Sequence, residues 1–217
     1  MFLLALAFVT WPRTAHGQGS SQPSPPTVDV KTPSSDNVRV YRDITLWGAQ
    51  SVADPHILGG LDGQRMFAFG ARFSQRFYRF SKVNLNGHLE FKPAVVFSQP
   101  AAHGERNYFY GAGGSAGLEL EKRRWRRLQP FFDMSGGLVI FTRPAPVPEA
   151  RRLNFTMEVG PGMRIPLRRR RFMKFGLWYF HFSNASTAPR NPGFDGLLLY
   201  VGYVLDNSIP TRTTAAN

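Results

Sequence analysis

Apolar and polar residues alternate along much of this chain, in runs short enough to be β-strands. Successive side chains of a strand point to opposite faces, so a period of two predicts a strand with one apolar face. One such run alternates Phe67, Phe69, Ala71 and Phe73 with Ala68, Gly70, Arg72 and Ser74. No segment has a convincing helical period. The pattern predicts eight strands, over 38–52, 64–78, 83–98, 106–121, 128–143, 153–166, 172–184 and 196–206.

The connections between these segments alternate in length. Three are tight or basic, at 80–82, 123–127 and 168–171. Four are longer and rich in Pro and Gly, at 54–63, 99–105, 144–152 and 185–196. An even number of strands with short turns at one end and long loops at the other is typical of a bacterial outer-membrane barrel. We therefore predict an all-β fold, an eight-stranded antiparallel outer-membrane β-barrel, because closure removes the exposed sheet edges. Soluble eight-stranded carriers share the pattern, so a soluble lipid-binding barrel is the alternative.

The first residues resemble a targeting segment rather than part of the fold. A short apolar run, 2–9, precedes the small residues Ala15 and Gly17, which predicts a secretory signal peptide over 1–17. Residues 18–36 are rich in Pro and Ser and predict a flexible linker. The barrel domain is expected over 37–206, and 207–217 form a C-terminal tail.

The composition of the chain excludes several kinds of site and partner. The chain has no cysteine, which excludes disulfides, thiolate metal sites and cysteine nucleophiles. Its histidines show no metal-ligand spacing, so we expect neither metal nor cofactor. The net charge is +13, but much of the excess lies in 122–127 and 168–171, where turns are expected. This distribution argues against nucleic acid as a partner.

Charged residues within the strands indicate ion pairs inside the barrel. We expect one or more of Glu119, Glu121, Asp133 and Glu158 to pair with Arg72, Arg76 or Arg164. Four arginines of the long connections could contact lipid A phosphates, because a guanidinium binds phosphate in a bidentate manner, or could simply be solvated. They are Arg143, Arg151, Arg152 and Arg190.

The segment from His181 to Asp195 contains a nucleophile, a base and an acid. His181 and Ser183 are two residues apart, so a strand directs both to one face, about 6–7 Å apart. The turn Asn191-Pro192-Gly193 would bring Asp195 back beside that strand. Ser, His and a carboxylate together can perform nucleophilic catalysis. On its own, His-x-Ser is common in strands and is more often the pattern of a hydrogen-bonded interfacial histidine beside an unrelated serine.

The seventh predicted strand indicates where this group would lie. One face carries Met173, Phe175, Leu177, Tyr179, His181 and Ser183, an apolar band that ends in an aromatic and then in polar groups. If both termini are periplasmic, this strand ends at the outer leaflet. The expected location of the group is therefore the lipid-facing surface at headgroup depth.

His181-Phe182-Ser183-Asn184-Ala185 followed by Asn191-Pro192-Gly193 resembles the signature of the lipid A 3-O-deacylases, the PagL-like acyloxyacyl hydrolases. The resemblance implies an eight-stranded outer-membrane barrel that hydrolyses the ester-linked acyl chain at the 3-position of lipid A. It assigns Ser183 as nucleophile and His181 as base, with Asn184 and Asn191 supporting the site or its oxyanion. Asp195 matches the acid, where the family has Glu.

The partners implied are lipid A or lipopolysaccharide and the membrane lipids, with no cofactor, metal or nucleic acid. Two alternatives stay open. In the first, the chain is a non-catalytic outer-membrane or lipid-binding barrel of the same fold, in which Asp195 marks decay of the triad. In the second, it is a soluble exported carrier. The sequence is silent on oligomeric state.

Overall fold

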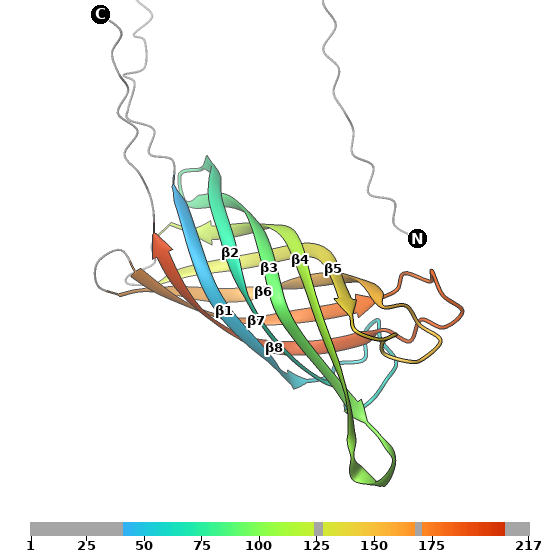
Figure 1. Ribbon diagram of the computed structural model, residues 1–217. Helices are drawn as coiled ribbons and strands as arrows, with labels where there is room; N and C mark the ends of the chain where they lie inside the picture. Colours follow the sequence, from blue (N-terminus) through green and yellow to red (C-terminus); the bar gives the residue numbers. More distant parts are fainter. Residues whose placement is uncertain (1–40, 124–127, 168–170, 207–217) are drawn as a thin grey trace, which may run out of the picture. The chain divides into compact units, whose positions relative to one another are not determined.

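The computed structural model describes residues 41–123, 128–167 and 171–206, which form a closed barrel of antiparallel strands (Figure 1). Each strand pairs with the next, and β8 pairs with β1 to close the sheet. The predicted fold class is confirmed. The strands are β1 (Arg42–Ala53), β2 (Arg65–Arg79), β3 (Val83–Pro100), β4 (Arg106–Lys122), β5 (Gln129–Phe141), β6 (Leu153–Pro166), β7 (Arg171–Ser183) and β8 (Phe194–Asp206).

The connections follow the predicted alternation where they are described. At the end where β1 begins, Phe80–Lys82 form a tight turn between β2 and β3, closed by a hydrogen bond from Phe80 N to Val83 O. The other end carries the long loops, and the β3–β4 hairpin extends well beyond its neighbours (Figure 1). The expected signal peptide (1–17), linker (18–36) and tail (207–217) lie outside the described residues, as do 124–127 and 168–170 of the two basic clusters.

The described helical structure is one short 3₁₀ turn, Ala102–Gly104. No helix within 41–123, 128–167 and 171–206 is long and apolar enough to cross a membrane.

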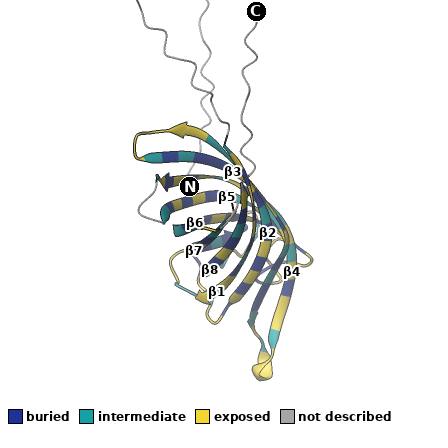
Figure 2. Cartoon of the chain, turned by 90° about the vertical axis from the view of Figure 1, so that its left-hand side faces the viewer, coloured by how far each residue is buried: buried dark blue, intermediate teal, exposed yellow. Residues whose placement is uncertain are grey.

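Buried and exposed positions alternate along the strands (Figure 2), and the side chains of the two faces differ sharply in polarity. Large apolar side chains point outward, among them Leu46, Phe67, Leu89, Phe91 and Ile140. Charged side chains point inward. A soluble carrier has the opposite arrangement, with an apolar interior for its ligand, whereas an apolar exterior around a polar lumen is typical of a membrane-spanning barrel.

Arg72 is the centre of the polar layer inside the barrel. Its guanidinium forms ion pairs with Glu90 (2.5 Å), Glu119 (3.3 Å) and Asp133 (2.5 Å). Lys174 also pairs with Glu119, at 2.6 Å. The pairing of Glu119 and Asp133 with Arg72 confirms the expected interior ion pairs.

Lysines complete this network where the sequence analysis considered only arginines. Lys92 contacts Glu158 and donates to Ser115 Oγ at 2.8 Å. Glu158 therefore pairs with a lysine rather than with an arginine. A buried charge requires a partner, and the strands from β2 to β7 all contribute charged side chains to the layer.

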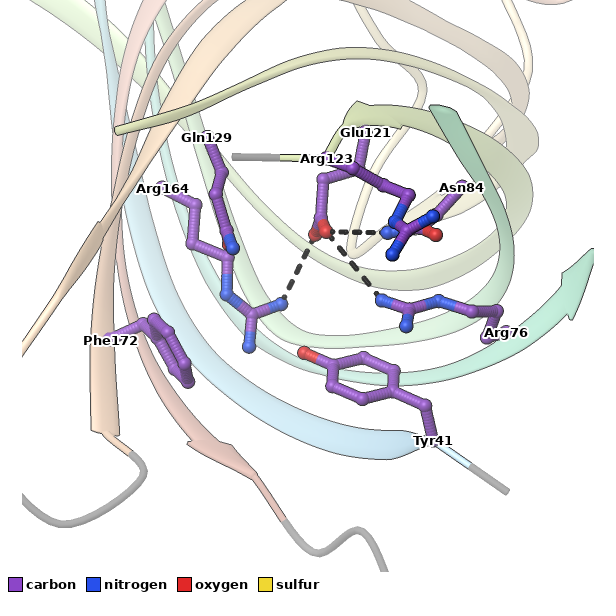
Figure 3. A pocket seen from close by; sticks show the side chains of 8 residues that line it. All are labelled: Tyr41, Arg76, Asn84, Glu121, Arg123, Gln129, Arg164 and Phe172. Carbon is purple, nitrogen blue, oxygen red and sulfur yellow. Dashed lines mark hydrogen bonds and ion pairs between the residues drawn. The ribbon is translucent and has the colours of Figure 1, made fainter. Parts of the chain in front are cut away.

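A second charged group closes the end of the barrel where β1 begins, around a cavity of about 230 Å³ (Figure 3). Glu121 lies between Arg164 (3.4 Å) and Arg76 (3.6 Å) and accepts a hydrogen bond from Asn84 (3.1 Å). Arg164 also pairs with Asp43, at 3.0 Å. These charges compensate one another, so the group is best understood as a polar plug.

Aromatic side chains fill the lumen at the opposite end. Phe97 contacts Phe182 edge to face with ring centroids 5.2 Å apart, and it contacts Phe194 at 5.3 Å. Trp178 and Tyr200 stack at 4.0 Å. These rings pack β7 and β8 against the inside of the barrel at the end where their outward-facing side chains form the candidate site.

Candidate functional site

The candidate site lies where β7 ends and β8 begins. The two strands are antiparallel, and their register places His181 opposite Asp195. Phe180 and Phe182 are buried in the lumen, so Tyr179, His181 and Ser183 lie on the outward face. The predicted division of the seventh strand into two faces is therefore confirmed.

The structure brings His181 and Asp195 together. His181 Nδ1 lies 2.7 Å from Asp195 Oδ1. A carboxylate accepts but does not donate, so this hydrogen bond requires a proton on Nδ1, and in the neutral ring Nε2 then presents a lone pair. The Asp195 side chain is 1% exposed and that of His181 is 13% exposed. An imidazole in this tautomer can take a proton at Nε2.

Ser183 is on the same face as His181 but is not hydrogen-bonded to it. Within the described part of the chain, no hydrogen bond joins the two side chains. Their Cα atoms are separated by two residues of strand, about 6–7 Å. Hydrogen bonds between catalytic side chains are often long before substrate binds. A Cα separation of this size is therefore compatible with proton transfer from Ser183 Oγ to His181 Nε2.

Asp195 is surrounded by hydrogen-bond donors. Oδ2 accepts from three consecutive backbone N–H groups of the β1–β2 loop, those of Ile57 (2.6 Å), Leu58 (2.6 Å) and Gly59 (2.8 Å). Oδ1 accepts from the Tyr179 hydroxyl at 2.8 Å as well as from His181. Five donors favour the ionised carboxylate and fix its orientation.

Sequence reasoning missed these partners of Asp195. The three loop donors are main-chain groups, which leave no side-chain signal. Tyr179 was assigned to the aromatic belt, and only its position beside Asp195 shows a second use for its hydroxyl. The approach of a loop so distant in sequence could not be foreseen from local pattern.

Two glycines permit the loops to approach the site closely. Gly193 has a φ of +65°, and a Cβ there would lie 3.0 Å from His181 Cε1. A Cβ at Gly59 would lie 3.0 Å from the Asp195 backbone nitrogen. Both distances are shorter than ordinary contacts, so neither position accepts a larger residue without movement.

The two asparagines have different environments. Asn191 Oδ1 accepts from Asn184 N at 2.9 Å, and Asn184 Nδ2 donates to Arg190 O at 2.8 Å. Asn184 is buried and holds the β7–β8 loop. Asn191 is exposed, and within the described residues its amide N–H₂ group has no partner. The group available to a ligand is therefore the Asn191 amide.

Three of the loop arginines are engaged with the backbone. Arg143 donates to Tyr108 O (2.7 Å), Arg152 to Phe141 O (3.0 Å) and Arg151 to Thr187 O (3.0 Å). Arg190 is exposed.

Solved structures of other proteins share the barrel fold of this chain. The crystal structure of the outer membrane enzyme PagL is similar to this chain with a TM-score of 0.55 and 16% identity, over 74% of this chain and 97% of that one. The outer membrane protein OprG from Pseudomonas aeruginosa gives a TM-score of 0.47 and 10% identity, over 79% of this chain and 98% of that one. At these identities the likeness concerns the fold alone.

No curated protein sequence matches the chain. The profile of the family described as "Lipid A 3-O-deacylase (PagL)" matches residues 62–204, well over half of the sequence and including every strand from β2 to β7. The chain belongs to the PagL family of lipid A 3-O-deacylases.

Proposed function

We propose that this protein is an outer-membrane serine esterase that hydrolyses the 3-O-linked acyl chain of lipid A. The observation that carries the proposal is the pairing of His181 with a buried, multiply hydrogen-bonded Asp195 on the outward face of the barrel, two residues from Ser183. Membership of the deacylase family supports the substrate.

The proposed location follows from the polarity of the two faces. The apolar exterior would contact the hydrocarbon of the bilayer, and the polar lumen would stay away from it. With the termini of the barrel in the periplasm, β7 ends at the outer leaflet. Lipid A occupies that leaflet, so Ser183 and His181 would meet its ester groups at the membrane surface. An export signal at 1–17 is part of this proposal.

In the proposed reaction, His181 Nε2 takes the proton of Ser183 as Oγ attacks the ester carbonyl. The bond between the carbonyl carbon and the sugar oxygen then breaks, and His181 returns the proton to that oxygen. Water then attacks the acyl-enzyme as His181 takes one of its protons, the bond between the carbonyl carbon and Ser183 Oγ breaks, and His181 returns the proton to Oγ as the fatty acid leaves. Asp195 orients the ring and stabilises the imidazolium formed in each half-reaction.

The tetrahedral intermediate also needs a donor for its oxyanion. The Asn184 N–H is already bonded to Asn191, and the Asn184 amide to Arg190. Of the two asparagines expected to support the site, we therefore assign the oxyanion contact to the Asn191 amide. Asn184 would act by holding Asn191 in place. Removing one such donor typically lowers kcat by about 10²–10³.

A deacylation assay with the purified barrel tests the proposal. The protein in detergent is incubated with lipid A, and released hydroxy fatty acid is quantified for the wild type, Ser183→Ala and His181→Ala. Heat-modifiable mobility on a gel reports that each variant is folded. We expect release by the wild type alone.

Three outcomes would contradict the proposal. Activity retained by folded Ser183→Ala or His181→Ala would remove those residues from the catalytic role. A folded wild type with no activity on any lipid A ester would leave the non-catalytic barrel as the better account. Recovery of the protein from a soluble fraction without detergent would contradict the membrane location.

A further inference from the structure

We infer that the β1–β2 loop is a cradle built for the short carboxylate of Asp195, and that residues 57–59 and Tyr179 position this acid for the reaction. This inference rests on the proposed function. We use "carboxylate cradle" for the backbone N–H groups of Ile57, Leu58 and Gly59. The profile match begins at residue 62, so the cradle lies outside the segment matched to the family.

Because of the cradle, the two carboxylate oxygens of Asp195 have different hydrogen-bond partners. Oδ2 is taken up by three amide donors at 2.6–2.8 Å, and this leaves Oδ1 for His181 and Tyr179. A carboxylate gripped at one oxygen by three fixed donors cannot rotate. Its other oxygen is therefore held in line with His181 Nδ1, which fixes the imidazole with Nε2 free.

This arrangement accounts for an aspartate at position 195, where the resemblance of the sequence to the deacylases implies a glutamate. A glutamate at 195 would carry one additional methylene, about 1.5 Å of extra reach. The three amide distances are already at the short end of the hydrogen-bond range, so the longer side chain would clash with the loop or turn away from it. The side chain of Asp195 is one methylene shorter, and the β1–β2 loop lies correspondingly closer to the backbone of β8, so that the hydrogen bonds are still made.

Gly59 makes the approach possible. A Cβ at this position would lie 3.0 Å from Asp195 N, 3.1 Å from Phe194 C and 3.2 Å from Gly193 C. All three neighbours are backbone atoms, which cannot rotate away. An alanine at 59 would therefore push the loop outward and lengthen all three hydrogen bonds to Oδ2.

Gly60 provides a matched control in the same loop. A Cβ at Gly60 would meet no atom within 4 Å. Its backbone hydrogen bond to Pro192 O, at 2.9 Å, is retained in an alanine. Gly59→Ala and Gly60→Ala thus make the same chemical change, and only the first disturbs the cradle.

The test measures kcat and KM for release of hydroxy fatty acid from lipid A in detergent micelles. It compares the wild type, Ser183→Ala, Gly59→Ala, Gly60→Ala, Asp195→Glu and the double variant Gly59→Ala/Asp195→Glu, each folded by heat-modifiable mobility. A misplacement of about 1 Å can lower a rate about 100-fold. We expect Gly59→Ala to lower kcat by about 10- to 100-fold with KM unchanged, and Gly60→Ala to match the wild type.

Asp195→Glu should lower kcat by about tenfold or more, although it restores the acid found in the family. In the double variant the displaced loop leaves room for the longer side chain. Its loss should therefore be clearly smaller than the product of the two single losses. A purely structural role for Gly59 would not produce this rescue.

The outcomes separate the cradle from the proposed function. Suppose that the wild type is active and Ser183→Ala is inactive, so that the proposed esterase is supported. Two results would then contradict the cradle: Gly59→Ala as active as Gly60→Ala, or Asp195→Glu more active than the wild type. A folded wild type without activity would overturn the esterase itself. In that case the NMR signal of the His181 Nδ1 proton still tests the cradle, which requires that signal to weaken in Gly59→Ala and to persist in Gly60→Ala.

Discussion

Replacement of Asp195 by asparagine changes the charge of the site while keeping its shape. The aspartate offers two acceptor oxygens, one to the amides of residues 57–59 and one to His181 and Tyr179. Asparagine has only one acceptor, and its other group is a donor. Three amide donors at 2.6–2.8 Å will retain the oxygen, so the new N–H₂ group must face His181.

The consequence is a change of tautomer. A donor facing Nδ1 requires that nitrogen to be unprotonated, which moves the ring proton to Nε2 and removes the base that Ser183 needs. In a serine triad the same substitution lowers kcat by about 10⁴. We expect Asp195→Asn to lower kcat by about 10³–10⁴, or about 4–5.5 kcal/mol of transition-state stabilisation.

The assay is the initial rate of hydroxy fatty acid release from lipid A at saturating substrate. Asp54→Asn is the matched control, because Asp54 belongs to the same loop and its Oδ2 accepts from Gly63 N at 2.7 Å. It should retain activity within about threefold, corresponding to no more than about 0.6–0.7 kcal/mol. A folded Asp195→Asn variant within tenfold of the wild type would refute the assignment of Asp195 as the orienting acid.

Three further predictions concern the neighbours of the site and the lumen. Tyr179→Phe removes one hydrogen bond to Asp195 and should lower the rate about three- to tenfold in the same assay; an unchanged rate would show that the hydroxyl is dispensable. Asn191→Asp keeps the acceptor for Asn184 N–H but loses the amide donors, and it should lower kcat about 10²–10³-fold; a loss below threefold would exclude the oxyanion role. Arg72→Met leaves three buried carboxylates without their shared partner, so urea unfolding in lipid should show a free energy of unfolding lower by about 3–5 kcal/mol. Arg79→Met, at an exposed position, should not show this loss.

Most of the fold could be predicted from the sequence because a barrel strand repeats a simple pattern. Period-two alternation identified all eight strands, and the predicted bounds of the sixth, 153–166, agree with β6. The start of β8 was placed two residues late, at 196, because Phe194 and Asp195 follow a turn and carry no alternation of their own. Interior pairs between Arg72 and the carboxylates followed from the rule that buried charges require partners.

The site could be predicted only in part. His181 and Asp195 could be brought together because a turn returns the chain directly alongside β7. The amides of 57–59 could not be found, since main-chain donors are the same at every residue. The assignment of the oxyanion contact to Asn191 and of the supporting role to Asn184 likewise depends on which side-chain amide is already hydrogen-bonded. The spacing of the two residues in the sequence does not reveal this.

A mass spectrum of lipid A from a bacterium expressing the chain tests the central claim most directly. Expression of the wild type should remove the mass of one hydroxyacyl chain from lipid A, and Ser183→Ala, present in the outer membrane at the same level, should leave the spectrum unchanged. An unchanged spectrum with the folded wild-type barrel in the outer membrane would contradict the account, as would the same loss of mass with Ser183→Ala.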